Sequence, residues 1–172
     1  MFLTGLSGAG KSTIANVLRV KLLERGGRAV TLLDGDVVRK SLSAELGFGK
    51  QDRDANIRRI GFVAAEITKC GGVAICAPIA PYDQVRKEVR AAITAHGGFL
   101  LVYVAAPRDL RGARSQGPLR ESAGRSRAVL HRHLRPVRAS GRCRRLTIGA
   151  EDSPEEAAGR ILRALESEGY LA

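Results

Sequence analysis

The sequence predicts a three-layer α/β fold in which a parallel β-sheet is covered by helices on both faces. Nearly continuous apolar runs recur along the chain, as in parallel strands that are buried on both faces. These runs are 29–33, 73–77 and 99–104. Helical stretches alternate with them, which is the β–α order of a parallel sheet. These stretches are 11–25, 54–69, 82–96 and 154–168. At 172 residues, we expect 1–172 to form one domain.

The first expected strand runs directly into a glycine-rich loop. The loop reads Gly5-Leu6-Ser7-Gly8-Ala9-Gly10-Lys11-Ser12-Thr13. It matches the phosphate-loop pattern Gly-x-x-x-x-Gly-Lys-Ser/Thr in full, between a strand and a helix. Backbone N–H groups of such a loop cradle nucleotide phosphates, Lys11 can reach the β- and γ-phosphates, and Ser12 can ligate Mg²⁺. We therefore expect the P-loop NTPase variety of the fold, with ATP and Mg²⁺ as ligands. A glycine-rich turn without a ligand is the alternative.

Two aspartates follow the second expected strand, in Asp34-Gly35-Asp36. Ligands of parallel sheets bind beyond the carboxyl ends of the strands, so both can face the phosphates. One can hold Mg²⁺, and the other can orient or deprotonate an acceptor hydroxyl. The alternative is a polar turn in which Asp36 caps a helix.

Basic, amide and aromatic side chains follow as candidates for binding an acceptor. Arg53 and Asn56 lie three residues apart in an expected helix and share one face, which suits an anionic substrate that carries a base or sugar. Phe48, flanked by glycines, can stack on a purine or pack in the core. Arg39, Arg58 and Arg59 belong to the same basic region, but Arg58 and Arg59 point away from Arg53 and Asn56, and one of them can be a solvated surface charge. An ordinary basic helix face is the alternative for the whole region.

The net charge of +12 is concentrated in one segment. Residues 108–145 hold twelve arginines, no lysine and two acids, and so carry +10 of the total. A nucleic-acid-binding surface normally mixes lysine and arginine across several elements, so nucleic acid is not the expected partner. An RNA-binding module that uses this segment remains the alternative from another functional class.

The remaining composition favours a cytoplasmic protein. No apolar run reaches membrane-spanning length, and no signal peptide precedes the first strand. We expect Cys70, Cys76 and Cys143 to be buried, reduced thiols, because they are few and lack metal-binding spacing. Because a central strand begins directly after Met1, we also expect an N-terminal segment to be missing or the chain to be part of a longer protein.

Taken together, these motifs resemble the adenylylsulfate (APS) kinase family. The matching segments are Gly5–Thr13, Leu33-Asp34-Gly35-Asp36 with Arg39, Leu46-Gly47-Phe48, Asp52-Arg53, Asn56-Ile57-Arg58-Arg59 and Ile79-Ala80-Pro81-Tyr82. The resemblance covers about the first 107 residues and the last helix. It implies transfer of the ATP γ-phosphate to the 3′-hydroxyl of adenylyl sulfate, which yields PAPS for sulfate assimilation. Another small-molecule kinase of the same fold is the alternative.

The resemblance also implies roles for individual residues. Lys11 and Ser12 would serve ATP and Mg²⁺, with Asp34 as a further metal ligand and Asp36 at the reacting hydroxyl. Adenylyl sulfate would be bound by the following set: Asp36, Arg39, Phe48, Arg53, Asn56, Ile79 and Ala80. Some members carry a phosphorylatable serine where this chain has Ala80, so we expect direct transfer without a phospho-enzyme. A homodimer and a sulfurylase partner or fused domain both remain open.

The arginine-rich segment 108–145 departs from the family, which has a Lys-Gly-Leu-Tyr motif and a basic lid there. Back-translated with allowed codons and read one nucleotide later, Gln116-Gly117-Pro118-Leu119-Arg120 can encode Lys-Gly-Leu-Tyr. In the same frame, 129–138 can encode the family's Phe-Ser-Thr-Gly-Ile-Ser-Asp-Pro-Tyr-Glu. We therefore predict a local frameshift that opens near Arg108 and closes near Arg145. A natural arginine-rich lid or a nucleic-acid-binding insert are the rivals.

Overall fold

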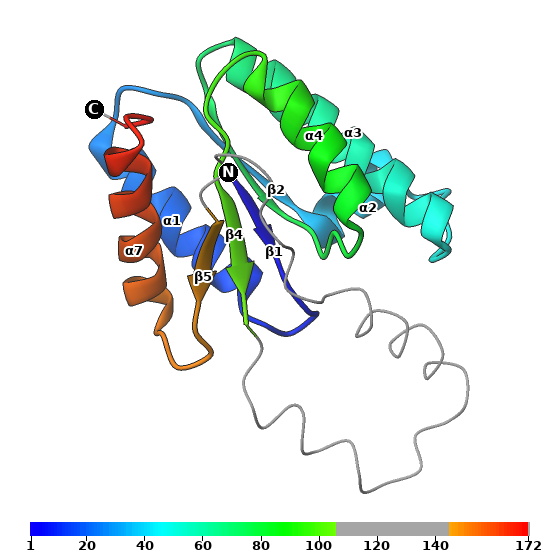
Figure 1. The fold of residues 1–172 in the computed structure, drawn as a ribbon, viewed down its shortest axis with the longest axis horizontal. Helices are drawn as coiled ribbons and strands as arrows, with labels where there is room; N and C mark the ends of the chain where they lie inside the picture. The colour runs from blue at the N-terminus through cyan, green and yellow to red at the C-terminus, as the bar shows by residue number, and fades with distance from the viewer. Residues whose placement is uncertain (106–144, 172) are drawn as a thin grey trace, which may run out of the picture.

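The computed structural model describes residues 1–105 and 145–171 and shows a parallel sheet between two helical layers (Figure 1). Its strands are β1 (Phe2–Thr4), β2 (Val30–Asp34), β3 (Val73–Ala77), β4 (Leu101–Val104) and β5 (Arg145–Ile148). All pairings are parallel, in the order β2-β3-β1-β4-β5. The predicted three-layer architecture is confirmed. The frameshift prediction and the expected lid concern the segment 108–145. Apart from Arg145, this segment lies outside the described residues.

The helices divide between the two faces of this sheet. Their bounds are α1 (Lys11–Arg25), α2 (Gly35–Leu42), α3 (Lys50–Lys69), α4 (Asp83–Thr94) and α7 (Pro154–Ser167). One core cluster joins α1 and α7 to the sheet through residues such as Leu18 and Ile161. The other joins α3 and α4 to the opposite face through Ile60 and Val85. Helices therefore cover both faces of the sheet, and the ends of its strands are left accessible.

The central strands confirm the expectation from continuous apolar runs, whereas β2 does not. All three residues of β1 and four of the five in β3 are buried. In β2 only Leu33 is buried, because this strand forms an edge of the sheet. An apolar run therefore indicated a strand correctly without indicating its position in the sheet.

Two elements were not predicted from the sequence. Helix α2 begins directly after β2, where the sequence offered a helix only in the alternative of a polar turn capped by Asp36. Its N-cap is Asp34, whose carboxylate accepts a hydrogen bond from the Asp36 N–H at 3.0 Å, so the capping role that this alternative gave to Asp36 belongs to Asp34. Strand β5 begins at Arg145, the last residue of the arginine-rich segment, and pairs with β4. Helix α3 begins at Lys50, four residues earlier than the expected 54.

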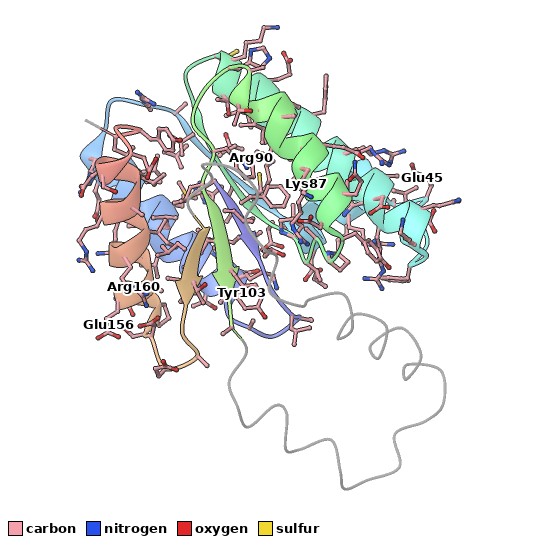
Figure 2. The ribbon with its side chains drawn as sticks, viewed as in Figure 1. Glu45, Lys87, Arg90, Tyr103, Glu156 and Arg160 are labelled. Carbon is pink, nitrogen blue, oxygen red and sulfur yellow. The ribbon has the colours of Figure 1, made fainter. Side chains whose placement is uncertain are left out.

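The last helix begins as its sequence indicates. Ser153 and Glu156 form a capping box, with Pro154 in the first turn. Arg160 then reaches back from α7, pairing with Asp152 at 2.5 Å and donating to the Thr147 carbonyl at 3.0 Å. Figure 2 shows Glu156 and Arg160 on the first half of this helix. These contacts fix the turn between β5 and α7.

Of the two cysteines that the structure describes, one is buried as predicted and the other is exposed. Cys76 is buried in β3, and burial raises the pKa of its thiol to about 11. Cys70 is exposed, because it follows the last turn of α3 rather than lying within a strand. Cys143 lies outside the described residues. Among the helices of the described part, none is long and apolar enough to cross a membrane.

Candidate functional site

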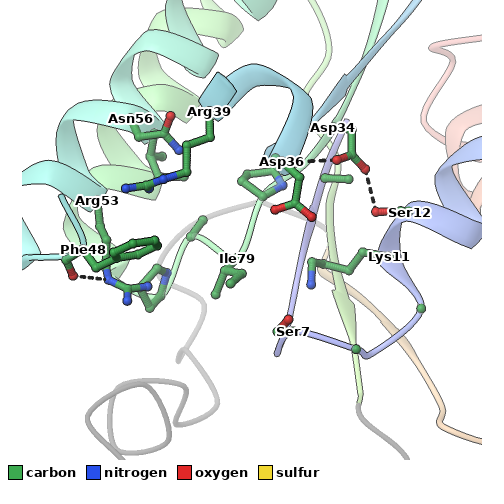
Figure 3. Close-up of a pocket in the computed structure, with 18 of the residues that line it drawn as sticks. Ser7, Lys11, Ser12, Asp34, Asp36, Arg39, Phe48, Arg53, Asn56 and Ile79 are labelled. Carbon is green, nitrogen blue, oxygen red and sulfur yellow. Dashed lines mark hydrogen bonds between the residues drawn. The ribbon is translucent and has the colours of Figure 1, made fainter. Parts of the chain in front are cut away.

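A cavity of about 390 Å³ lies at the carboxyl ends of β1, β2 and β3. Figure 3 shows its labelled side chains, with the phosphate loop at one end and Phe48 and Arg53 at the other. Every residue predicted to bind substrate or metal lines this cavity. So do all the residues of the predicted phosphate loop except Gly5, Leu6 and Ala9.

The phosphate loop has the backbone that its glycines permit. Gly8 and Gly10 have φ values of +77° and +88°, in the left-handed region that residues with a Cβ rarely adopt. A Cβ on Gly5 would come within 2.3 Å of the Val104 carbonyl oxygen, so Gly5 allows the loop to pass close to β4. Ala9 packs into the core beneath the loop. Gly5 and Ala9 therefore shape the loop from outside the cavity.

Lys11 begins α1 and is buried at the floor of the loop. Its Nζ donates to the carbonyls of Leu6 at 2.7 Å and Gly5 at 3.2 Å. Burial lowers the pKa of Lys11, while the carboxylates of Asp36 and Asp34 act in the opposite direction. The cation is thus held within the loop and flanked by acids at the neighbouring strand end.

Ser12 and Asp34 form the part of the site that suits a divalent cation. The Ser12 Oγ donates a hydrogen bond to Asp34 Oδ2 at 2.6 Å. A hydroxyl and a carboxylate are hard oxygen ligands of the kind that Mg²⁺ prefers. No cluster of three or more His, Cys, Asp or Glu side chains occurs in the described part of the chain, so substrate or water oxygens would complete the coordination.

Phe48 forms the far end of the cavity together with two arginines. Its side chain is 68% exposed, which excludes the core-packing alternative. The Arg39 guanidinium lies 4.2 Å from the ring centroid and that of Arg53 lies 5.9 Å from it. Arg53 Nε also donates to the Phe48 carbonyl at 2.7 Å, and Arg39 donates to the carbonyls of Leu46 and Gly47. An exposed ring beside two guanidinium groups offers apolar surface and positive charge to a flat, anionic ligand.

Asn56 lies one turn beyond Arg53 on α3 and also lines the cavity. Its side chain is 8% exposed, and its Oδ1 accepts no hydrogen bond from the described residues. A buried carbonyl oxygen without a donor is costly, so its placement favours a ligand that donates to it. The shared face of Arg53 and Asn56 predicted from the sequence is therefore confirmed.

Arg58 and Arg59 do not belong to the site. Arg58 Nε pairs with Glu88 of α4 at 2.8 Å, outside the cavity. Arg59 pairs with Glu45 at 2.5 Å and donates to the Leu42 carbonyl, which ties α3 to the end of α2. The solvated-surface alternative therefore holds for both of these arginines, whereas Arg39 and Arg53 line the cavity.

The segment after β3 forms one wall of the cavity. Ile79 and Ala80 line it, together with the prolines on either side. Thr4 and Arg86 hold this segment from behind, through hydrogen bonds to its carbonyls. Sequence reasoning missed both residues. Thr4 reads as the end of an apolar strand, and Arg86 reads as one of several charges in an amphipathic helix.

Comparison with known proteins agrees with this geometry. The family model for adenylylsulphate kinase matches residues 1–128. A sulfate adenylyltransferase of Aspergillus oryzae is 55% identical over 107 residues, which are 62% of this chain and 19% of that protein. One from Emericella nidulans is 41% identical over 173 aligned positions, which are 99% of this chain and 30% of that protein. The chain thus spans less than a third of the length of these relatives.

Two solved structures have the same fold and recognisable sequence similarity. The hexameric APS kinase from Thiobacillus denitrificans superposes with a TM-score of 0.72 and 48% identity, covering 99% of this chain and 29% of that one. The Mycobacterium tuberculosis APS kinase in complex with AMPPNP and APS superposes with a TM-score of 0.73 and 29% identity, covering 96% and 95%. With a family model that matches most of its length, this chain belongs to the adenylylsulphate kinase family.

Proposed function

We propose that the chain is an ATP-dependent kinase that transfers the γ-phosphate of ATP to the 3′-hydroxyl of adenylyl sulfate, which gives PAPS. The observation that carries this proposal is the two-ended cavity. A phosphate loop lies at one end, Arg39, Phe48 and Arg53 lie at the other, and Asp34 and Asp36 stand between them. A donor phosphate and a nucleotide acceptor can therefore meet at the aspartates.

The phosphate loop would orient the donor. Its N–H groups would bind the phosphate oxygens, and Lys11 would exchange its contacts with the Gly5 and Leu6 carbonyls for the transferring phosphoryl group. Ser12 and Asp34 would hold Mg²⁺, which supplies positive charge against the phosphates when it is bound. The donor set fits that ion, since both groups offer oxygen within one hydrogen-bond length of each other.

The opposite end would bind and orient the acceptor. Phe48 would stack on the purine, and Asn56 Oδ1 would accept a hydrogen bond from its amino group. Arg39 and Arg53 would attract the sulfate and phosphate oxygens. Asp36, which lies in the cavity beside Lys11, would accept the proton of the 3′-hydroxyl as the new P–O bond forms and the bond from the γ-phosphorus to the departing ADP breaks.

The test is an assay with radiolabelled ATP, Mg²⁺ and adenylyl sulfate, in which labelled PAPS is separated by chromatography. We expect label transfer to adenylyl sulfate and none to its 3′-deoxy analogue. Lys11→Ala should lose this activity, whereas Lys21→Ala, a lysine on the same helix outside the cavity, should retain it. Transfer to another small molecule but not to adenylyl sulfate would overturn the proposal.

We further infer that a sulfurylase, separate or fused, supplies the acceptor. Support comes from the relatives named sulfate adenylyltransferase, of which this chain corresponds to a small part. Adenylyl sulfate must be made by adenylyl transfer to sulfate, which is the reaction that this name describes. Co-purification with a sulfurylase from the native source tests this inference.

We also propose that the chain forms a homodimer, which light scattering of the purified chain tests.

A further inference from the structure

Ala80 has an unusual backbone for its residue type. Its φ is +39°, and it is the one non-glycine residue with positive φ in the described ranges. This left-handed region is unfavourable for residues with a Cβ, so neighbouring contacts must stabilise it. Ala80 is also 1% exposed and lies between Ile79 and Pro81 in the cavity wall.

Two buried side chains donate hydrogen bonds to this strained segment. Arg86 Nη1 on α4 donates to the Ala80 carbonyl at 2.6 Å. The Thr4 Oγ1 at the end of β1 donates to the Ile79 carbonyl at 2.6 Å, with a longer contact of 3.4 Å to Ala80. Their exposures are 5% and 4%. The Ile79–Ala80 turn is therefore held from two separate elements.

Arg86 contacts the wall of the cavity from behind. It does not line the cavity, and its Nη2 pairs with Asp83 Oδ1 at 3.2 Å at the start of its own helix. A buried guanidinium is costly unless its hydrogen bonds are made, so its position is tightly constrained. Thr4 in turn directly precedes Gly5, so the same turn is connected to the phosphate loop.

We propose that Arg86 is a positioning residue for the acceptor. Together with Thr4, it holds the Ala80 carbonyl and thereby keeps Ile79 in the acceptor end of the cavity. This inference rests on the proposed function, because it assigns Ile79 to an acceptor surface. Arg86 itself contacts neither substrate, so its effect must appear in the acceptor KM rather than in ATP binding.

The kinetic test compares Arg86→Met with a matched control on the same helix. Lys87→Met removes a cation that pairs with the same Asp83 at 2.9 Å but makes no contact with Ala80 (Lys87 is labelled in Figure 2). Arg86→Met should raise the KM for adenylyl sulfate about tenfold and leave the KM for ATP within about twofold. Arg86→Lys should recover part of this loss, and Lys87→Met should match the wild type.

A second substitution separates positioning from general support of α4. In the Arg86→Met background, Ala80→Gly removes the cost of a positive φ. If Arg86 acts by holding that backbone, the double variant should regain a lower acceptor KM than Arg86→Met alone. If it merely supports helix packing, Ala80→Gly should give no recovery, and the inference is wrong.

Hydrogen exchange tests the inference without relying on turnover. In ligand-free Arg86→Met, a peptide covering 78–82 should exchange faster than in the wild type, with β1 and β3 unchanged. If Arg86→Met fails to fold, the exchange rate at 78–82 is compared between the wild type and the variants Arg86→Lys and Thr4→Val. A wild-type chain that does not phosphorylate adenylyl sulfate would overturn the proposed function. Unchanged exchange at 78–82 in folded variants would overturn this inference alone.

Discussion

Ser12 and Asp34 are joined by a hydrogen bond of 2.6 Å between the hydroxyl and one carboxylate oxygen. The other oxygen of Asp34 accepts the N–H of Asp36, so one side chain caps α2 and contacts the phosphate loop at once. The hydrogen bond between Ser12 and Asp34 links the first turn of α1 to the end of β2, although these two residues are 22 positions apart. One carboxylate therefore connects the phosphate loop to the start of α2.

The first prediction concerns the metal requirement. Ser12→Ala should raise the Mg²⁺ concentration for half-maximal rate about tenfold or more, since one oxygen ligand is lost and a charge-assisted contact is worth about 1.5–3 kcal/mol. The measurement is the initial rate against Mg²⁺ at saturating substrates. Ser41→Ala, an exposed serine on α2 outside the cavity, is the control. An equal Mg²⁺ dependence in both variants would contradict the metal assignment of Ser12.

The sequence was sufficient for the parts of the site with a fixed local pattern. The phosphate loop, the two aspartates and the shared face of Arg53 and Asn56 follow from short spacings, because a loop or one helical turn fixes their geometry. The same helical spacing indicates that Arg58 and Arg59 point away from Arg53 and Asn56, but it does not identify their partners. Their exclusion from the cavity depends on Glu88 and Glu45, which lie on other elements.

The parts that were missed depend on contacts between different elements of the fold. The roles of Thr4 and Arg86 arise from carbonyls 75 and 6 residues away, in a turn whose φ no pattern indicates. Helix α2 is short, and its only buried side chain is Val38, so it gives little apolar periodicity. The edge position of β2 likewise depends on the order of strands, which local sequence does not encode.

The second prediction separates acceptor binding from ATP binding. Arg53→Ala and Asn56→Ala should each raise the KM for adenylyl sulfate roughly ten- to hundredfold, through loss of a charge-assisted contact or of a buried acceptor. The KM for ATP should change little. Arg58→Ala removes an arginine from the same helix that pairs with Glu88 outside the cavity, so it should leave both constants near those of the wild type. Equal effects on both substrates would show that Arg53 and Asn56 are structural.

The third prediction uses two exposed phenylalanines as a matched pair. Phe48→Ala should raise the acceptor KM about tenfold, since stacking on a base is worth about 1–3 kcal/mol. Phe62 has nearly the same exposure, 66% against 68%, but lies outside the cavity. Phe62→Ala should therefore leave the acceptor KM unchanged. Steady-state kinetics with adenylyl sulfate varied at saturating ATP provides the measurement. The stacking role is wrong if the two variants behave alike.

The last prediction concerns the arginine-rich segment, 108–145. If it arose by a local frameshift, sequencing the gene across codons 105–148 should reveal one change that opens the altered frame and a second that closes it. Translation in the restored frame should lower the net charge and return a lysine, a tyrosine and a phenylalanine at family positions. A protein with the restored segment should phosphorylate adenylyl sulfate faster than the present chain, because closure of a lid completes a kinase site and excludes water.

The control for this comparison lowers charge without restoring the family motifs. Replacing arginines of 108–145 by glutamine in the present frame reduces the charge of the segment but supplies no Lys-Gly-Leu-Tyr motif. If the frame hypothesis is correct, only the restored segment should increase kcat, measured at saturating ATP and adenylyl sulfate. Equal gains from both replacements would indicate that charge alone slows the present chain. A present chain as active as the restored one would contradict the frameshift, and the arginines would then require a function of their own.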